Sequence, residues 1–224
     1  MARILMIDTA LQDAGVCISI DGKDPVLLKN DRQKEHAAWI QPAIKELTRL
    51  AGTTLDDLDA VAVSAGPGSY TGLRVGMATA KGLCYVLKIP LISVNTLKIM
   101  AHAATKQLEG DKWYCPMIDA RRLEVYTAIF NRDLDEIMPP VALVLEPGSF
   151  DNWLEKRHIC FFGDGSPKYN NMLKSADASF VNVTASAADG LELAAGMYAR
   201  REFCDLAYAE PQYIKAFYTP VKAK

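Results

Sequence analysis

Two aspartates stand at the ends of apolar stretches, where a carboxylate can hold a metal ion. The stretch Met6-Ile7 ends in Asp8, and the similar stretch Met117-Ile118 ends in Asp119. A hydrated Mg²⁺ prefers such oxygen ligands and keeps several of its waters. The turns that follow contain no glycine, although phosphate-binding loops generally use glycine to bring backbone N–H groups close to the anion. The two aspartates are therefore candidates for a magnesium–nucleotide site or, alternatively, for carboxylates that cap turns.

Two turns rich in glycine invite comparison with nucleotide-binding motifs. They are Gly66-Pro67-Gly68-Ser69 and Gly163-Asp164-Gly165-Ser166, and each follows an apolar run. The first lacks the Gly-Lys-Ser/Thr of a P-loop, and Thr71 stands where the dinucleotide-binding pattern places its third glycine. Each turn is either a phosphate-tolerant helix start or simply a tight connection between a strand and a helix.

The other residue types that carry chemistry are few and scattered. The chain has three histidines and five cysteines. An odd number of cysteines without a Cys-x-x-Cys pair argues against a disulfide framework and against a thiolate metal site. No His-Glu-x-x-His motif and no pairing of a nucleophile with a base is evident. We expect buried free thiols, no metal site and no catalytic residue in this chain.

The segment after the first glycine turn is predicted to be a helix with a closely packed side. Ser69 or Thr71 can cap it by accepting a hydrogen bond from a free backbone N–H. Gly72, Gly76 and Gly82 lie in its body, and each interior glycine costs roughly 0.5–1 kcal/mol relative to alanine. Gly72 and Gly76 are four residues apart, and Ala80 extends the stripe. We expect another backbone to lie very close along that stripe.

A second helix is predicted from about Glu35 to Ala51, and together the two helices suggest a partner interface. The apolar residues of the segment 35–51 recur at spacings of three and four and so form one apolar face. Trp39 lies outside that face and needs a second apolar surface. Two neighbouring helices with spare apolar surface predict a dimer face, in which two helices from each subunit form a four-helix contact. The residues expected to carry this interface are His36, Trp39, Ile40, Ile44, Leu73, Arg74, Met77 and Lys81.

The two halves of the chain repeat one pattern, which predicts two similar α/β lobes. In each half an apolar strand ending in aspartate is followed by two more strands, a helical stretch and a strand that ends in a glycine turn. A boundary near Gly110 gives an N-terminal lobe of residues 1–109 and a C-terminal lobe of residues 110–224. The C-terminal lobe would include a helix from about Ala187 to Phe203, capped by Thr184 or Ser186.

Composition limits the classes of partner. The chain has 224 residues, a formal charge of -2 and 50% hydrophobic residues, which is enough for a sizeable core. This charge does not give the basic footprint of a nucleic-acid binder. No apolar run reaches the ~20 residues that a membrane helix needs, so we expect a soluble, cytoplasmic protein without a membrane partner.

The motifs taken together resemble the glycoprotease-like TsaB (YeaZ) family of the bacterial tRNA threonylcarbamoyladenosine machinery. The resemblance rests on Gly66–Arg74 and Ala78–Leu83, with Ile7-Asp8-Thr9, His36, Pro42, Ile118–Arg121 and Glu124–Tyr126 in the same order. It implies a duplicated actin-like, hexokinase-like fold with a mixed sheet and flanking helices in each lobe. Such folds hold ATP between the lobes, so the resemblance makes Asp8, Asp119, Gly163, Asp164 and Gly165 the candidate nucleotide-binding residues.

The resemblance also implies a non-catalytic subunit. Such a subunit pairs with a catalytic paralogue, TsaD, and the ATPase TsaE docks on the pair, so ATP and metal would bind the partners and tRNA would be reached only through the complex. In isolation a homodimer is expected. TsaD holds its metal with two histidines one helical turn apart, whereas here His36 is followed four residues later by Ile40. The alternatives are an active actin-like ATP-dependent enzyme, a metal-dependent hydrolase of the glycoprotease type, or a plain interaction module.

Overall fold

The first half of the chain forms a mixed five-stranded sheet. The structure is a computed structural model that describes residues 2–20, 24–32 and 35–215. The order of the strands is β3-β2-β1-β4-β5, in which β1–β3 are an antiparallel meander and β4 and β5 join in parallel. The strands are β1 (Ile4–Asp8), β2 (Ala14–Ser19), β3 (Val26–Asn30), β4 (Ala60–Gly66) and β5 (Leu91–Asn95).

The second half repeats this sheet strand for strand. Its order is β8-β7-β6-β9-β10, again an antiparallel meander followed by two parallel strands. The strands are β6 (Trp113–Asp119), β7 (Glu124–Phe130), β8 (Glu136–Val144), β9 (Ile159–Phe162) and β10 (Ala178–Phe180). Because Asp8 closes β1 and Asp119 closes β6, the duplication predicted from the sequence is confirmed at the level of sheet topology.

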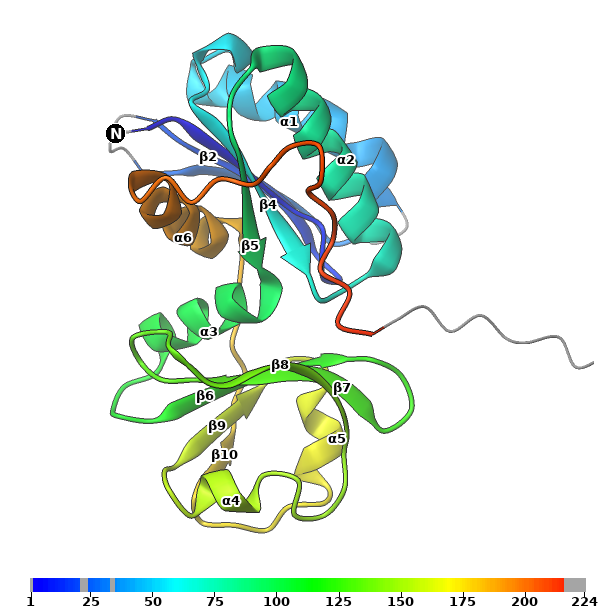
Figure 1. Ribbon diagram of the computed structural model, residues 1–224, viewed down its shortest axis with the longest axis vertical. Helices are drawn as coiled ribbons and strands as arrows, with labels where there is room; N and C mark the ends of the chain where they lie inside the picture. The colour runs from blue at the N-terminus through cyan, green and yellow to red at the C-terminus, as the bar shows by residue number, and fades with distance from the viewer. Residues whose placement is uncertain (1, 21–23, 33–34, 216–224) are drawn as a thin grey trace, which may run out of the picture.

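The helices and sheets form alternating layers (Figure 1). One face of the first sheet is covered by α1 and α2, and the opposite face by α6 together with α3. Helix α3 also packs on the second sheet, so it lies between the two sheets, while α4 and α5 cover the outer side of the second sheet. The helices are α1 (His36–Ala51), the 3₁₀ helix η2 (Leu55–Asp57), α2 (Tyr70–Leu87), α3 (Thr96–Gln107), α4 (Asp151–Leu154), α5 (Ser166–Asn170) and α6 (Ala187–Ala199).

The start of α2 confirms the expected cap and the expected close packing. Ser69 Oγ accepts a 3.3 Å hydrogen bond from the Gly72 backbone N–H. A Cβ atom added at Gly72 would overlap the carbonyl oxygen of Thr9, and one at Gly76 would overlap the Thr9 hydroxyl. The neighbouring backbone is therefore the loop after β1. Gly82 differs, because a Cβ atom there would meet nothing within 4 Å.

Residues 187–215 depart from the predicted division into lobes 1–109 and 110–224. Helix α6 packs on β1, β2, β4 and β5 of the first sheet. The segment 204–215, which we call the C-terminal strap, then runs beside α2 (Figure 1). Its backbone joins the first sheet where the N–H of Cys204 donates to Leu91 and that of Gln212 donates to Ala65, at 2.9 and 2.7 Å. A sheet with parallel strands needs apolar cover on both faces, and α6 supplies the second cover here.

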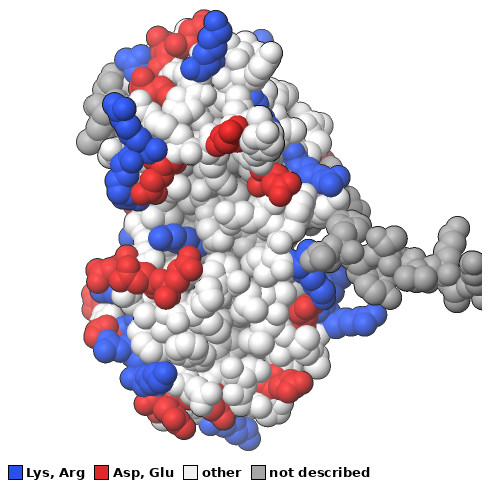
Figure 2. All heavy atoms as spheres, viewed as in Figure 1, with Lys and Arg blue, Asp and Glu red and all other residues white. Residues whose placement is uncertain are grey.

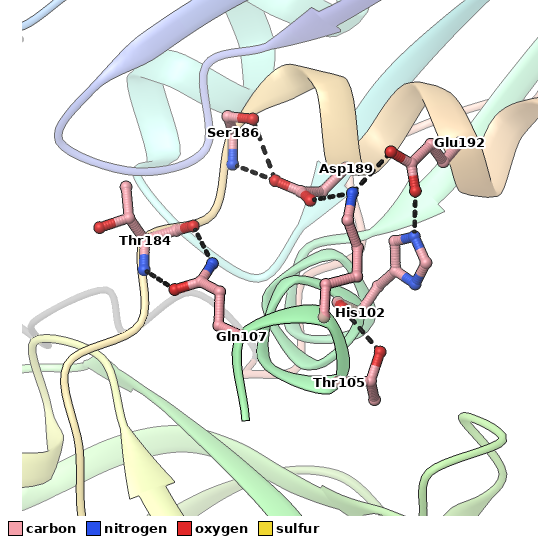
Figure 3. A network of polar contacts seen from close by, with 8 residues as sticks. His102, Thr105, Gln107, Thr184, Ser186, Asp189 and Glu192 are labelled. Atoms are coloured by element: carbon pink, nitrogen blue, oxygen red, sulfur yellow. Dashed lines mark hydrogen bonds and ion pairs between the residues drawn. The ribbon is translucent and has the colours of Figure 1, made fainter. Parts of the chain in front are cut away.

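A polar network ties α6 to α3 (Figure 3). Lys106 Nζ donates to Asp189 Oδ1 at 3.1 Å and to Glu192 Oε1 at 2.6 Å. The other carboxylate oxygen of Glu192 lies 2.8 Å from His102 Nε2. Asp189 also completes a capping box with Ser186 at the start of α6, which confirms Ser186 as the cap. No helix in the described part of the chain combines the length and the hydropathy needed to cross a membrane.

Candidate functional site: the interlobe cleft and the outer helices

A cavity of about 690 Å³ lies between the two lobes. Asp8, Asp13 and Lys29 line it from the first lobe, and Gly163 and Asp164 line it from the second. The structure thus brings together three of the five predicted nucleotide-binding residues. The other two, Asp119 and Gly165, are adjacent to it in the second lobe.

Asp8 is held inside the first lobe by its own neighbours. Its Oδ1 accepts a 3.2 Å hydrogen bond from the Ala10 N–H, and its side chain is 7% exposed. Burial raises the pKa of this carboxyl, and hydrogen bonds from Ser64 and Ala10 oppose only part of that rise. The hydrogen bond to the Ala10 N–H, two residues further on, makes this carboxyl a cap of the turn after β1.

Asp119 likewise bonds to the turn that follows it. Its Oδ1 accepts from the Arg121 N–H at 2.5 Å and from Lys168 Nζ at 2.7 Å. Lys168 lowers the pKa of this carboxyl below its usual range. The backbone N–H of Asp119 in turn donates to Asp164 Oδ1 at 2.9 Å. Both strand-end carboxylates therefore stabilise the turns that follow them.

The second glycine turn is a tight connection. Gly163 has a φ of 94°, a left-handed conformation that glycine adopts without strain. The N–H of Gly165 donates to the Met117 carbonyl at 3.0 Å, so this amide faces β6 and is unavailable to a phosphate. Ser166 Oγ donates back to the Gly163 carbonyl at 2.8 Å. Of the two alternatives for this turn, these contacts favour the tight connection between a strand and a helix over a phosphate-tolerant helix start.

The charges that line the cleft suit a neutral or cationic group better than a triphosphate. Asp8, Asp13 and Asp164 carry carboxyl groups and Lys29 carries the single amine among the described residues that line it. Within the described part of the chain, His, Cys, Asp and Glu side chains form no group of three that could hold a metal ion. The described lining therefore offers a triphosphate one amine and three carboxyl groups.

The predicted interface residues are mostly buried in the chain's own core. Five of them are between 1% and 4% exposed, namely His36, Ile40, Ile44, Leu73 and Met77. Ile40, Ile44 and Met77 belong to the apolar cluster on the first sheet. Trp39 is partly buried against the same cluster. The reason is physical: the apolar stripe of each helix covers the sheet, so little of it is left for a partner.

Arg74 and Lys81, the remaining two, contact the C-terminal strap. Lys81 Nζ donates to the carbonyls of Ala207 and Ala209, at 3.3 and 2.8 Å. Arg74 Nε donates to the Tyr213 hydroxyl at 3.1 Å. The strap therefore covers this side of α2, which the sequence pattern did not predict.

The free apolar surface lies on another side of α2. Tyr85 is 78% exposed and Val86 is 74% exposed. Next to them a cavity of about 380 Å³ opens between α1 and α2, which we call the α1–α2 groove. It is lined by Gln41, Leu55, Ala78, Thr79, Gly82, Leu83, Val86 and Leu87. The spacing Ala78-Gly82-Val86, four residues apart, is the signal by which sequence reasoning could have found this side.

His36 begins α1 and is 3% exposed. The ring faces the backbone carbonyls of Gln12 and Asn30 and lies near the carboxyl groups of Asp13 and Asp8. Burial lowers the pKa of His36 in spite of these groups. The residue is thus part of the packing under the loop after β1, rather than a surface residue.

Sequence comparisons with known proteins identify relatives of this chain. A sequence model of the family described as "TsaD: tRNA N6-adenosine threonylcarbamoyltransferase" matches residues 30–215. The tRNA threonylcarbamoyladenosine biosynthesis protein TsaB of Escherichia coli (strain K12) is 30% identical over 220 residues, which are 95% of this chain and 94% of that protein. TsaB of Bacillus subtilis (strain 168) is 30% identical over 181 residues, which are 76% of this chain and 75% of that protein.

Solved structures are similar along nearly the whole chain. YeaZ from Pseudomonas aeruginosa superposes with a TM-score of 0.82 at 26% identity, covering 95% of this chain and 100% of that structure. A second Pseudomonas aeruginosa structure, described as similar to peptidase YEAZ, gives a TM-score of 0.83 at 26% identity, with 96% of this chain and 100% of that one covered. These similarities and the two matching sheets confirm the predicted two-lobed actin-like fold.

Proposed function

Because this chain belongs to the TsaB (YeaZ) family of tRNA threonylcarbamoyladenosine biosynthesis proteins, we propose that it is a non-catalytic subunit that supports this modification. It pairs with the catalytic paralogue TsaD, on which the ATPase TsaE also docks. ATP and the catalytic metal bind to those partners, and tRNA reaches this chain through the complex. Binding energy from an apolar helix face holds the active site of the partner in its working shape.

The α1–α2 groove is the observation that carries this proposal. It offers exposed apolar side chains, and Gly82 at its wall leaves open space where a Cβ would stand. An exposed apolar patch of this kind is costly in water and commonly marks a contact with another protein. Helices of a partner with the same fold could pack here in a four-helix contact.

The bonded carboxyl groups at the interlobe cleft favour the role of a non-catalytic subunit over that of an enzyme. The carboxyl group of Asp8 is bonded within the first lobe and that of Asp119 is paired with Lys168. Breaking those contacts to bind a metal would sacrifice the turns that they stabilise. The isolated chain is expected to self-associate weakly through the same groove, because two copies can cover each other's exposed patch.

Complex formation with matched variants tests the proposal. Val86→Glu places a charge in the α1–α2 groove, and Val144→Glu places the same charge on β8, where the side chain is 55% exposed. With purified TsaD from the same source, Val86→Glu should weaken binding at least about tenfold by calorimetry, because a buried unpaired charge is strongly unfavourable. Val144→Glu should bind like the unmodified chain. Equal binding by both variants would contradict the proposed docking face.

A further inference from the structure

An aromatic and cationic cluster lies where the C-terminal strap meets the start of α2. The Tyr213 ring lies 5.5 Å from the Tyr70 ring, centroid to centroid. The Arg74 guanidinium lies 4.2 Å from the Tyr70 centroid and also donates to the Tyr213 hydroxyl. Both rings keep exposed surface, 36% for Tyr70 and 43% for Tyr213. The strap therefore holds two tyrosines and one arginine together at the surface.

Two further arginines lie on the hairpin between β6 and β7, which the strap contacts through Lys215, two residues after Tyr213. Arg121 and Arg122 are both exposed, with φ of 73° and 50°. Left-handed backbone costs an ordinary residue roughly 1 kcal/mol or more, so hairpins usually place glycine or asparagine there. The strap links this hairpin to the tyrosines, since Lys215 Nζ lies 2.7 Å from the Glu124 carboxylate just after the turn. We call Tyr70, Arg74, Arg121, Arg122, Tyr213 and Lys215 the Tyr–Arg patch.

In the described part of the chain, the arginines of the Tyr–Arg patch are not paired with carboxylates. Around the patch, Asp119 is paired with Lys168 and Glu124 with Lys215. Within the described residues, the guanidinium groups of Arg74, Arg121 and Arg122 form no ion pair with a carboxylate, whereas the formal charge of the whole chain is -2. Figure 2 shows several basic side chains, with acidic ones among them, on the right-hand side beside the grey atoms.

We propose that the Tyr–Arg patch binds single-stranded RNA. Guanidinium groups would contact phosphates, and the exposed tyrosine rings would stack on unpaired bases, the combination that single-stranded recognition generally uses. The pairing of rings with arginines favours RNA over an acidic protein segment, which would need the charges alone. The inference deepens the proposed function: in the complex the RNA is the modified tRNA, and this chain touches one of its unpaired loops directly.

Polarisation of a fluorescein-labelled tRNA transcript, titrated with the full chain and with its TsaD complex, tests the inference. Arg121→Gln/Arg122→Gln removes two cations, and Arg200→Gln/Arg201→Gln is a matched control. The control pair is also exposed and adjacent, and Arg201 likewise has a positive φ, of 56°. The patch variant should flatten the slope of log K against log salt by about 1.4, since each phosphate contact in a single strand contributes about 0.7. Tyr213→Ala should weaken binding about 5- to 150-fold through lost stacking.

The outcomes separate this inference from the proposed function. If the complex forms but its tRNA affinity is the same with the patch variant as with the control, the patch does not bind RNA and the proposed function stands. The inference is also overturned if the unmodified chain binds no tRNA alone or in the complex. Displacement of the tRNA by polyglutamate with no effect of Tyr213→Ala would assign the patch to an acidic protein instead. If the unmodified chain forms no complex with TsaD, the proposed function itself fails.

Discussion

Thr9 and Gly72 are joined by contacts that fix α2 against the loop after β1. The Thr9 hydroxyl donates a 2.7 Å hydrogen bond to the Gly72 carbonyl, and the Thr9 carbonyl occupies the place where a Cβ of residue 72 would stand. The glycine is required by this approach of two backbones and not by a bound phosphate.

Paired substitutions in α2 test this explanation. Gly72→Ala should destabilise the chain by about 1–3 kcal/mol, because overpacking against a backbone outweighs the better helix propensity of alanine. Gly82→Ala should stabilise it by about 0.5–1 kcal/mol, since that Cβ meets open space. Urea unfolding of both variants measures the difference. A Gly72→Ala variant as stable as Gly82→Ala would show that the close approach is unimportant.

The sequence predicted the close packing of α2 because its glycines carry a known energetic cost. The choice of interface residues stays a prediction, and the sequence pattern on which it rests has a physical limit. Periodicity identifies an apolar stripe but does not say whether the sheet or a partner covers it, and Ile44 and Met77 proved to face the sheet. A glutamate at either position would therefore unfold the chain rather than test a complex. Helix α6 and the C-terminal strap follow the second lobe in the sequence but pack on the first lobe. No local sequence pattern indicates this long-range packing.

The network of Figure 3 predicts unequal effects for two carboxylates of α6. Asp189 completes the capping box and its side chain is 10% exposed, whereas the Glu192 side chain is 50% exposed. Asp189→Ala should lower the free energy of unfolding by about 1–2 kcal/mol through the lost cap. Glu192→Ala should cost at most about 1 kcal/mol, as for exposed ion pairs. Thermal unfolding of the two variants checks the order, and a larger loss for Glu192→Ala would contradict it.

His36 predicts how stability depends on pH. Burial lowers the pKa of His36 in the folded chain, so between that value and the unfolded pKa of about 6.5 the unfolded state binds more protons. The contribution of His36 to the free energy of unfolding should be complete above a pH of about 6.5. It should fall as the pH decreases from there toward the pKa of His36 in the folded chain. His36→Gln should remove this part of the slope. Urea unfolding of the unmodified chain and of His36→Gln between pH 5 and pH 8 measures it. An unchanged slope in His36→Gln would exclude the histidine as its source.

Formation of threonylcarbamoyladenosine in a reconstituted system tests the central claim most directly. The reaction would contain TsaD, TsaE, tRNA, ATP and the threonylcarbamoyl donor, with this chain added unmodified, as Val86→Glu, or as Asp8→Asn/Asp119→Asn, each checked for folding. The account predicts full product with the cleft variant, and little product with Val86→Glu or without the chain. Loss of product with the folded cleft variant, together with full product from Val86→Glu, would contradict it.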